Sequence, residues 1–193
     1  MTSGLHGYDL LEVDDRGAWR AWLEANYARA QGVWVVSPRR QADRSQLDYD
    51  ALVEEALCFG WVDGRVQPID EERIMQLVTP RRNGSAWARS NKERVARLAA
   101  AGAMAAAGTQ VVEAAKADGS WSRYDSAEAL EIPPDLDAAL AASASAAANF
   151  DAFSDAAKRA ILRWLIDAKR PETRAKRVAE TVARAARNER AGP

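Results

Sequence analysis

The chain is poor in the residues that build metal sites and disulfides. Its 193 residues include one cysteine and one histidine. A single cysteine cannot form an intramolecular disulfide, and zinc or iron–sulfur sites need several thiolate or imidazole ligands. The histidine, His6, lies close to the start of the chain, which argues against a histidine-based triad. We therefore expect no metal, no cofactor and no catalytic residues of these kinds.

The sequence also lacks long apolar runs and an excess of charge of either sign. No run approaches the roughly 18 apolar residues of a membrane span, and residues 1–10 lack the basic start and apolar centre of a secretion signal. The 27 lysines and arginines are balanced by 28 acidic residues, whereas dedicated nucleic-acid binders are usually strongly basic. These absences predict a cytoplasmic protein without a membrane partner, and they make a nucleic-acid partner improbable.

What the first part of the chain does contain is a mixture of helix and strand patterns. Apolar residues recur at helical spacing in residues 18–28 and 50–59, and Gly60 stands where a helix would stop. Residues 32–36 form a short β-branched run that is typical of a strand. Residues 61–69 and 73–79 alternate loosely between apolar and polar side chains on either side of an acidic turn, which predicts an antiparallel pair. Two further helices are expected, one beginning at about residue 86 or 91 and ending at 101, and one over residues 103–117.

The second part of the chain has only helical patterns. Pro133-Pro134 interrupts any helix, and we predict helices over 138–148, over 154–168 and from Pro171 onwards. The sequence therefore predicts an α+β fold: a small antiparallel sheet covered by helices, followed by an all-helical C-terminal unit. We expect the α+β unit to span residues 1–125 and the helical region 126–193.

Several separated blocks of the sequence resemble one family. In order along the chain they are Ala-Leu-Cys-Phe-Gly-Trp-Val-Asp-Gly at 56–64, Thr-Pro-Arg-Arg at 79–82, Ser-Ala-Trp at 85–87, Asn-Lys-Glu-Arg-Val at 91–95, Leu-Glu-Ile-Pro at 130–133 and Ala-Lys-Arg-Pro-Glu-Thr-Arg-Ala-Lys-Arg at 168–177. Together they resemble the YdeI/OmpD-associated family, whose members are also described as bacteriocin-protection proteins. The resemblance runs from about residue 19 to residue 186.

The resemblance implies a biological role but no particular reaction. The names of the family record an association with an outer-membrane porin and protection against antibacterial peptides, and no agreed catalytic residues come with them. This sequence departs from the usual pattern in three places. Val78 replaces a common phenylalanine, Ser37-Pro38-Arg39-Arg40 stands where Tyr-Lys-Lys is frequent, and Ala105-Ala106 replaces a Thr-Pro pair that would cap the next helix.

The predicted hairpin gathers the candidate site residues. Asp63 and Arg65 are two residues apart in one strand, which would place both side chains on one face of the sheet, and Thr79 and Arg81 would do the same in the returning strand. One interpretation is a structural ion pair at a tight turn. The other is an anion- or carbonyl-binding cluster built on an arginine guanidinium, with the tryptophans as walls unless they belong to the core. The candidate ligand-binding residues are Trp61, Asp63, Arg65, Thr79, Arg81, Trp87 and Asn91.

Two further features are expected to be structural. Cys58 ends a predicted helix, where the helix dipole disfavours a thiolate, so we expect a buried, inert thiol. The basic residues between Lys169 and Arg190 are interrupted by acids and lack interleaved aromatic residues, which favours a solvated helix face.

These observations favour a non-enzymatic cytoplasmic binding or protective protein of the YdeI/OmpD-associated type. Its partner would be a small molecule or a peptide held in a polar–aromatic pocket, with a link to resistance against antibacterial peptides or small molecules. One alternative is an enzyme that uses Asp63 with Arg65 or Arg81 on a small polar substrate. The second is a binder of nucleic acid or of an acidic partner through the last, basic helix.

Overall fold

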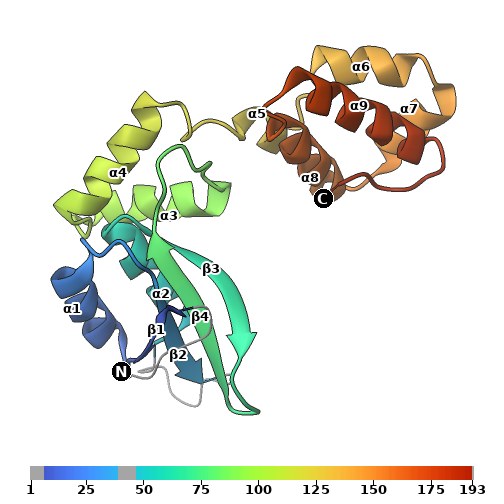
Figure 1. The fold of residues 1–193 in the computed structure, drawn as a ribbon. Coiled ribbons are helices and arrows are strands. Elements are labelled where there is room, and N and C mark those ends of the chain that lie inside the picture. The colour runs from blue at the N-terminus through green and yellow to red at the C-terminus, as the bar shows by residue number, and fades with distance from the viewer. Residues whose placement is uncertain (1–6, 39–46, 193) are drawn as a thin grey trace. The chain divides into compact units, whose positions relative to one another are not determined.

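A computed structural model describes residues 7–38 and 47–192 of the protein (Figure 1). His6 and residues 39–46, which include most of the polar connector after the first predicted strand, lie outside the described residues. The chain falls into two compact units, Met1–Trp121 and Ser122–Pro193. Within the described ranges, no helix has both the length and the apolar character needed to cross a membrane.

The first unit combines a four-stranded sheet with helices. Its elements, in chain order, are β1 (Asp9–Glu12), α1 (Arg16–Asn26), β2 (Val33–Pro38), α2 (Tyr49–Cys58), β3 (Trp61–Pro68), β4 (Arg73–Pro80), α3 (Arg89–Ala100) and α4 (Ala106–Ala117). The second unit is helical over its described residues. It comprises α5 (Asp125–Glu128), α6 (Pro134–Ala141), α7 (Ala144–Ala152), α8 (Asp155–Ile166) and α9 (Pro171–Ala185). The predicted α+β class with a helical C-terminal part is confirmed.

The sheet is mixed rather than purely antiparallel. Its strand order is β1-β2-β4-β3, and the β2–β4 and β3–β4 pairs are antiparallel, as expected for the hairpin. β1 pairs with β2 in parallel, from Asp9 opposite Val33 to Glu12 opposite Val36. Parallel neighbours need a crossover connection, which α1 supplies. Sequence analysis missed β1 because its four residues are too short to show an alternating pattern.

The main core lies between the sheet and the helices of the first unit. It joins residues from α1, α2, α3 and α4 to one face of the strands, with Trp19, Leu57, Val35 and Val78 almost completely buried. On the opposite face, a smaller cluster comprises Trp34, Val36, Met75 and Leu77. The sheet is therefore apolar on both faces, which explains why β2 reads as a continuous apolar run instead of an alternating one.

Helix α2 is the centre of this unit, because seven of its residues are buried. Its N-terminus is capped by Asp48, whose carboxylate accepts a hydrogen bond from the Ala51 amide at 2.6 Å. Its predicted stop is also confirmed, since Gly60 has φ +77°. A side chain at that position would meet Val111 of α4. Gly60 therefore allows both the left-handed turn into β3 and the close approach of α4.

The second unit has its own core. Leu136, Phe150, Ile161 and Leu165 from α6, α7 and α8 are its largest fully buried side chains, and Val178 of α9 packs with them. The predicted start of α8 is confirmed, since the Ser154 hydroxyl accepts from the Ala157 amide. Pro171 occupies the first turn of α9, as expected from its fixed φ.

The alanine-rich stretch 138–148 is not one helix. It is divided between α6 and α7, and Ser143 caps the second of these by accepting from the Ala146 amide at 3.4 Å. Alanine raises helix propensity along the whole stretch and so hides the turn. The packing of two short helices in the core therefore determines where the alanine-rich stretch turns.

Gly108 provides a test of the close packing between α2 and α4. A Cβ at Gly108 would collide with the carbonyl group of Cys58 and lie 2.8 Å from the Leu57 carbonyl oxygen. Replacing glycine by alanine in a helix gains about 1 kcal/mol of propensity, but overpacking against backbone costs about 1–3 kcal/mol or more. Because the atoms in the way belong to the backbone, we expect the cost to exceed the gain and Gly108→Ala to lower the free energy of unfolding in urea by about 1–2 kcal/mol. The exposed neighbour Gln110→Ala is the control, and a stabilised Gly108→Ala protein would contradict the packing.

Candidate functional site

A β-bulge separates two of the predicted site residues. Asp63 lies opposite Val78, but Val66 lies opposite Gln76, so β3 contains one residue more than β4 between these pairs. The extra residue breaks the alternation of side chains. The expectation that Asp63 and Arg65 share a face is therefore wrong, because it assumed an uninterrupted strand. Gln76 stabilises the bulge, since its side-chain amide donates to the Gly64 carbonyl at 2.7 Å.

Asp63 is engaged with Tyr49, a residue that sequence analysis did not select. The Tyr49 hydroxyl at the start of α2 donates to an Asp63 carboxylate oxygen at 2.9 Å. Burial and the hydrogen bond to Asp63 raise the pKa of Tyr49. Asn91, another predicted site residue, is held nearby in α3 by Arg94, which also pairs with Asp50 at 2.6 Å. Arg65 is exposed, and no contact joins it to Asp63.

Arg81 has a different set of contacts. Its guanidinium stacks on the Trp87 ring, with the central carbon 3.7 Å from the ring centroid, and donates to the Ala86 carbonyl at 2.6 Å and to the Ser85 carbonyl at 3.5 Å. These contacts hold the loop between β4 and α3. Asp63 attracts the guanidinium electrostatically, but the two side chains form no ion pair.

The structure places the remaining candidates in the core or against the sheet. Trp61 and Trp87 are each 1% exposed, so both side chains belong to the core. The Trp61 indole donates to the Tyr27 carbonyl at 2.9 Å. Thr79 lies opposite Val62 in the sheet and packs closely against Gly32. The predicted set therefore divides into an Asp63–Asn91 region and an Arg81–Trp87 region.

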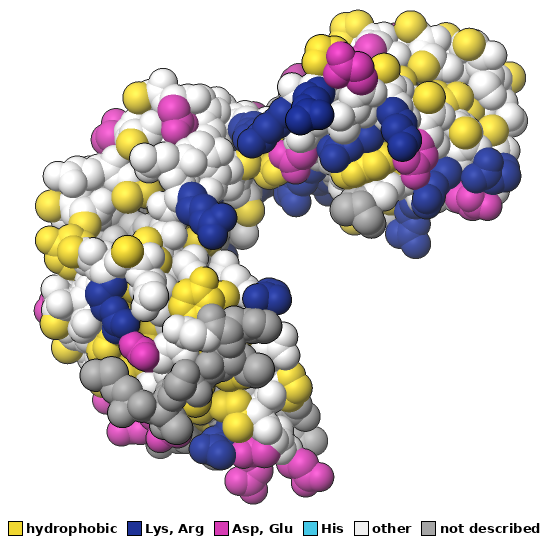
Figure 2. All heavy atoms as spheres, in the orientation of Figure 1, with side chains coloured by type: hydrophobic (Ala, Val, Ile, Leu, Met, Phe, Trp, Pro, Cys, Tyr) yellow, Lys and Arg dark blue, Asp and Glu magenta, His cyan; other side chains and the backbone are white. Residues whose placement is uncertain are grey.

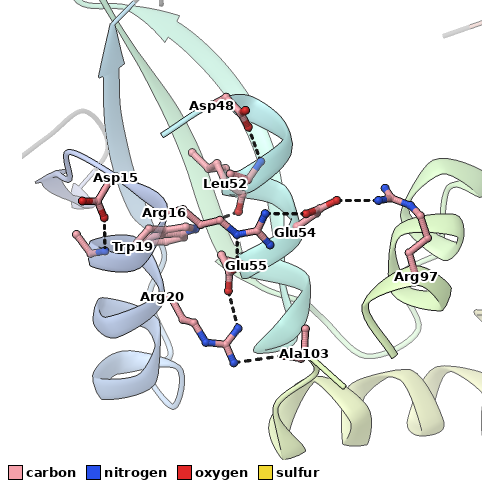
Figure 3. A network of polar contacts seen from close by, with 12 residues as sticks. Asp15, Arg16, Trp19, Arg20, Asp48, Leu52, Glu54, Glu55, Arg97 and Ala103 are labelled. Atoms are coloured by element: carbon pink, nitrogen blue, oxygen red, sulfur yellow. Dashed lines mark hydrogen bonds and ion pairs between the residues drawn. The ribbon is translucent and has the colours of Figure 1, made fainter. Parts of the chain in front are cut away.

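A buried carboxylate in α2 pairs with two arginines of α1 (Figure 3). Glu55, only 3% exposed, accepts from Arg16 at 2.6 Å and from Arg20 at 2.8 Å, both in α1. The adjacent Glu54 pairs with Arg16 and with Arg97 of α3, each at 3.1 Å. This network joins three helices. Sequence analysis could not find it, because the partners are 35 and 39 residues apart.

Cys58 is buried, as predicted. Burial raises the pKa of its thiol, and the charge of Glu55 raises it further, against the partial opposition of Arg20. The thiol therefore has little tendency to become the reactive thiolate.

The basic residues of α9 are largely used inside the second unit. Arg174 pairs with Asp135, Arg177 donates to the Trp164 carbonyl, Arg184 pairs with Glu180 and Arg187 pairs with Glu189. Figure 2 shows acidic side chains interspersed among the basic ones on the visible face of this unit. Such pairing reduces the charge that is free to meet phosphate groups.

The geometry defines a two-unit α+β protein in which arginines organise the polar clusters. Among the described residues, no three His, Cys, Asp or Glu side chains gather as a metal site. Residues 11–111 match the family model described as Domain of unknown function (DUF8412), and residues 129–188 match the model described as Bacteriocin-protection, YdeI or OmpD-Associated. The DUF8412 model covers more than half of the chain, so the chain belongs to the family that this model describes, and its helical unit matches the YdeI/OmpD-associated model over residues 129–188.

The blocks at residues 56–95 that prompted the family assignment fall within the DUF8412 match. Those at 130–133 and 168–177 fall within the YdeI/OmpD-associated match. No curated protein and no solved structure matches the chain.

We expect the Glu55 pairs to matter for stability. Glu55→Gln removes a buried charge but leaves two arginines, and breaking a fully buried pair costs about 3–5 kcal/mol. Because Arg16 and Arg20 are 48% and 35% exposed, water compensates in part, so we expect a loss of about 2 kcal/mol in urea unfolding. Glu24→Gln, at an exposed pair with Arg20, should cost less than about 1 kcal/mol. If Glu55→Gln and Glu24→Gln lowered the free energy of unfolding equally, the buried pairs of Glu55 would contribute no more than an exposed ion pair, and this prediction would be wrong.

Cys58 gives a test of the closed core. Because the chain has one cysteine, a thiol reagent reports on this site alone. We expect labelling of the folded protein to proceed only at the rate of unfolding, and labelling in denaturant to be fast and stoichiometric. Rapid labelling under native conditions would show that the α2–α4 contact opens without global unfolding.

Proposed function

We propose that this protein is a non-enzymatic binding protein that holds a small anionic or carbonyl ligand at the Arg81–Trp87 region of its first unit. As part of the same proposal, it works in the cytoplasm and protects the cell against antibacterial peptides or small molecules. The observation that carries the binding site is a poorly solvated arginine without a carboxylate partner.

The hydrogen-bond inventory of Arg81 supports this proposal. Burial lowers the pKa of Arg81 to about 10, and the attraction of Asp63 offsets only part of that effect. Its Nε atom and the Trp87 Nε1 atom are both buried and have no hydrogen-bond partner. Both groups can only donate, and a buried donor without an acceptor costs about 1–3 kcal/mol. An oxygen with negative charge satisfies the donors and stabilises the guanidinium.

The volume of the cavity beside these two donors limits the size of the group that can bind there. The cavity next to Arg81 and Trp87 measures about 10 Å³ and is also bordered by Gly84, Ala115 and Ser120. A volume of this size admits a single oxygen-sized group. The ligand is therefore recognised by one terminal oxygen of a carboxylate, a phosphate or a carbonyl group, while the rest of it lies outside.

Two observations favour binding over catalysis. The Asp63 carboxylate is already the acceptor of the Tyr49 hydroxyl, and the Cys58 thiol is buried with a raised pKa. The protective role rests on the description of the family model that matches residues 129–188. Cell fractionation of the producing organism tests the cytoplasmic location.

Thermal melts test the binding site. We expect inorganic phosphate, acetate or citrate to raise the melting temperature of the wild-type protein, because a ligand that binds only the folded state stabilises it. Arg81→Gln should remove this shift and cost about 1 kcal/mol or less in stability, since losing a desolvated charge offsets the lost carbonyl contacts. Trp87→Phe keeps a ring for stacking but removes the indole N–H, and it should weaken the shift.

The matched control is Arg89→Gln, which removes an exposed arginine paired with Glu93 and should leave the shift intact. If no anion or carbonyl compound stabilises the wild type, and if Arg81→Gln unfolds the protein, the Arg81–Trp87 region is architecture and the binding proposal is wrong.

A further inference from the structure

The second unit contains a pocket that the hairpin site does not involve. It measures about 260 Å³, close to the lower limit of about 300 Å³ for small-molecule sites. Residues from α5, α8 and α9 and from the segment before α6 line it. They are Ser126, Ala127, Glu131, Ile132, Pro133, Pro134, Leu162, Leu165, Ile166 and Arg174.

The backbone after α5 opens this pocket. Leu130 has φ +60°, and the Glu131 amide returns to the Ser126 carbonyl at 2.9 Å, so the chain turns sharply at the helix end. Pro133 then has extended backbone, with φ −70° and ψ 149°, before α6 begins. This extended segment and α8 border the pocket from two sides.

The floor and walls of the pocket are apolar. Ala127, Leu162 and Leu165 are core residues, at most 2% exposed, and form the floor. Ile132 stands at the wall and is 38% exposed, which is a high value for an isoleucine. An apolar group seated here would cover these side chains and gain about 25 cal/mol for each Å² removed from water.

Two charged side chains, Arg174 and Glu131, line the pocket, and only Glu131 can pair with a charged ligand. The charge of Arg174 is already paired, because the guanidinium donates twice to Asp135, at 2.6 and 2.8 Å, and once to the Leu165 carbonyl at 3.3 Å. This pairing also lowers the pKa of Asp135. The Glu131 side chain, by contrast, is exposed and forms no ion pair with another described residue. The rim therefore offers a carboxylate and no free cation.

We propose that this pocket binds a small organic amine, with the apolar body on the Leu162–Leu165 floor and the ammonium group on the Glu131 carboxylate. The volume suits one ring with a short alkyl chain. The charge of the ligand is opposite to that of the ligand proposed for Arg81. Each proposal therefore stands or fails on its own measurements.

Matched probes test this proposal. We expect 3-phenylpropylamine to bind the full-length protein and to shift the methyl NMR signals of Ile132, Leu162 and Ile166. The neutral 3-phenylpropan-1-ol should bind about fivefold more weakly, which is the effect of one ion pair at an exposed carboxylate. The anionic 3-phenylpropionate should bind more weakly still.

Two variants and one control complete the experiment. Glu131→Gln should reduce amine affinity about fivefold and leave the affinity for the alcohol unchanged. Ser126→Trp places a large side chain at the mouth from an exposed position and should abolish binding of both compounds. Glu172→Gln removes an exposed acid of α9 that does not line the pocket and should change neither. Equal affinity for amine and carboxylate, or methyl shifts confined to other residues, would overturn the proposal.

Discussion

The first unit depends on a single buried carboxylate in its central helix. Glu55 lies on the face of α2 that meets α1, in an environment where an unpaired charge would be very costly. Arg16 and Arg20 compensate it from α1, and this fixes the position of the crossover helix over the sheet. The same constraint orients β1, because α1 connects β1 to its parallel neighbour β2. The ion pairs of Glu55 with Arg16 and Arg20 therefore set the position of α1 and also contribute to stability.

Arg81 in the first unit and Arg174 in the second show that the partners of an arginine determine its role. Arg174 is paired with the Asp135 carboxylate and also donates to a carbonyl, so its charge is compensated inside the second unit, whereas Glu131 forms no ion pair with another described residue. Arg81 has carbonyl partners and an aromatic ring but no carboxylate in contact, and its Nε has no partner at all. The residue type is the same. A carboxylate partner separates the structural role of Arg174 from the binding role proposed for Arg81.

Much of the fold was predictable because its signals are local. The caps at Asp15 and Ser154, the glycine stop at Gly60 and the proline start at Pro171 each depend on residues within one turn, and each is present in the structure. The missing cap before α4 was also predictable, since Ala105 offers no side-chain acceptor. The candidate site was predictable only as a list of residues.

The sequence by itself determined the class of fold, the hairpin, several helix ends and the resemblance to the YdeI/OmpD-associated family, because the signals of periodicity, caps and motif blocks lie in neighbouring residues. Only the tertiary structure decided how Asp63 and Arg65 relate, since the bulge between them depends on the β4 register. It also decided that Asp63 faces Tyr49 and that Arg81 stacks on Trp87. These partners are determined by the way the loop after β4 folds back and by the packing of α2 against the sheet, where small differences in burial and hydrogen bonding outweigh local preference.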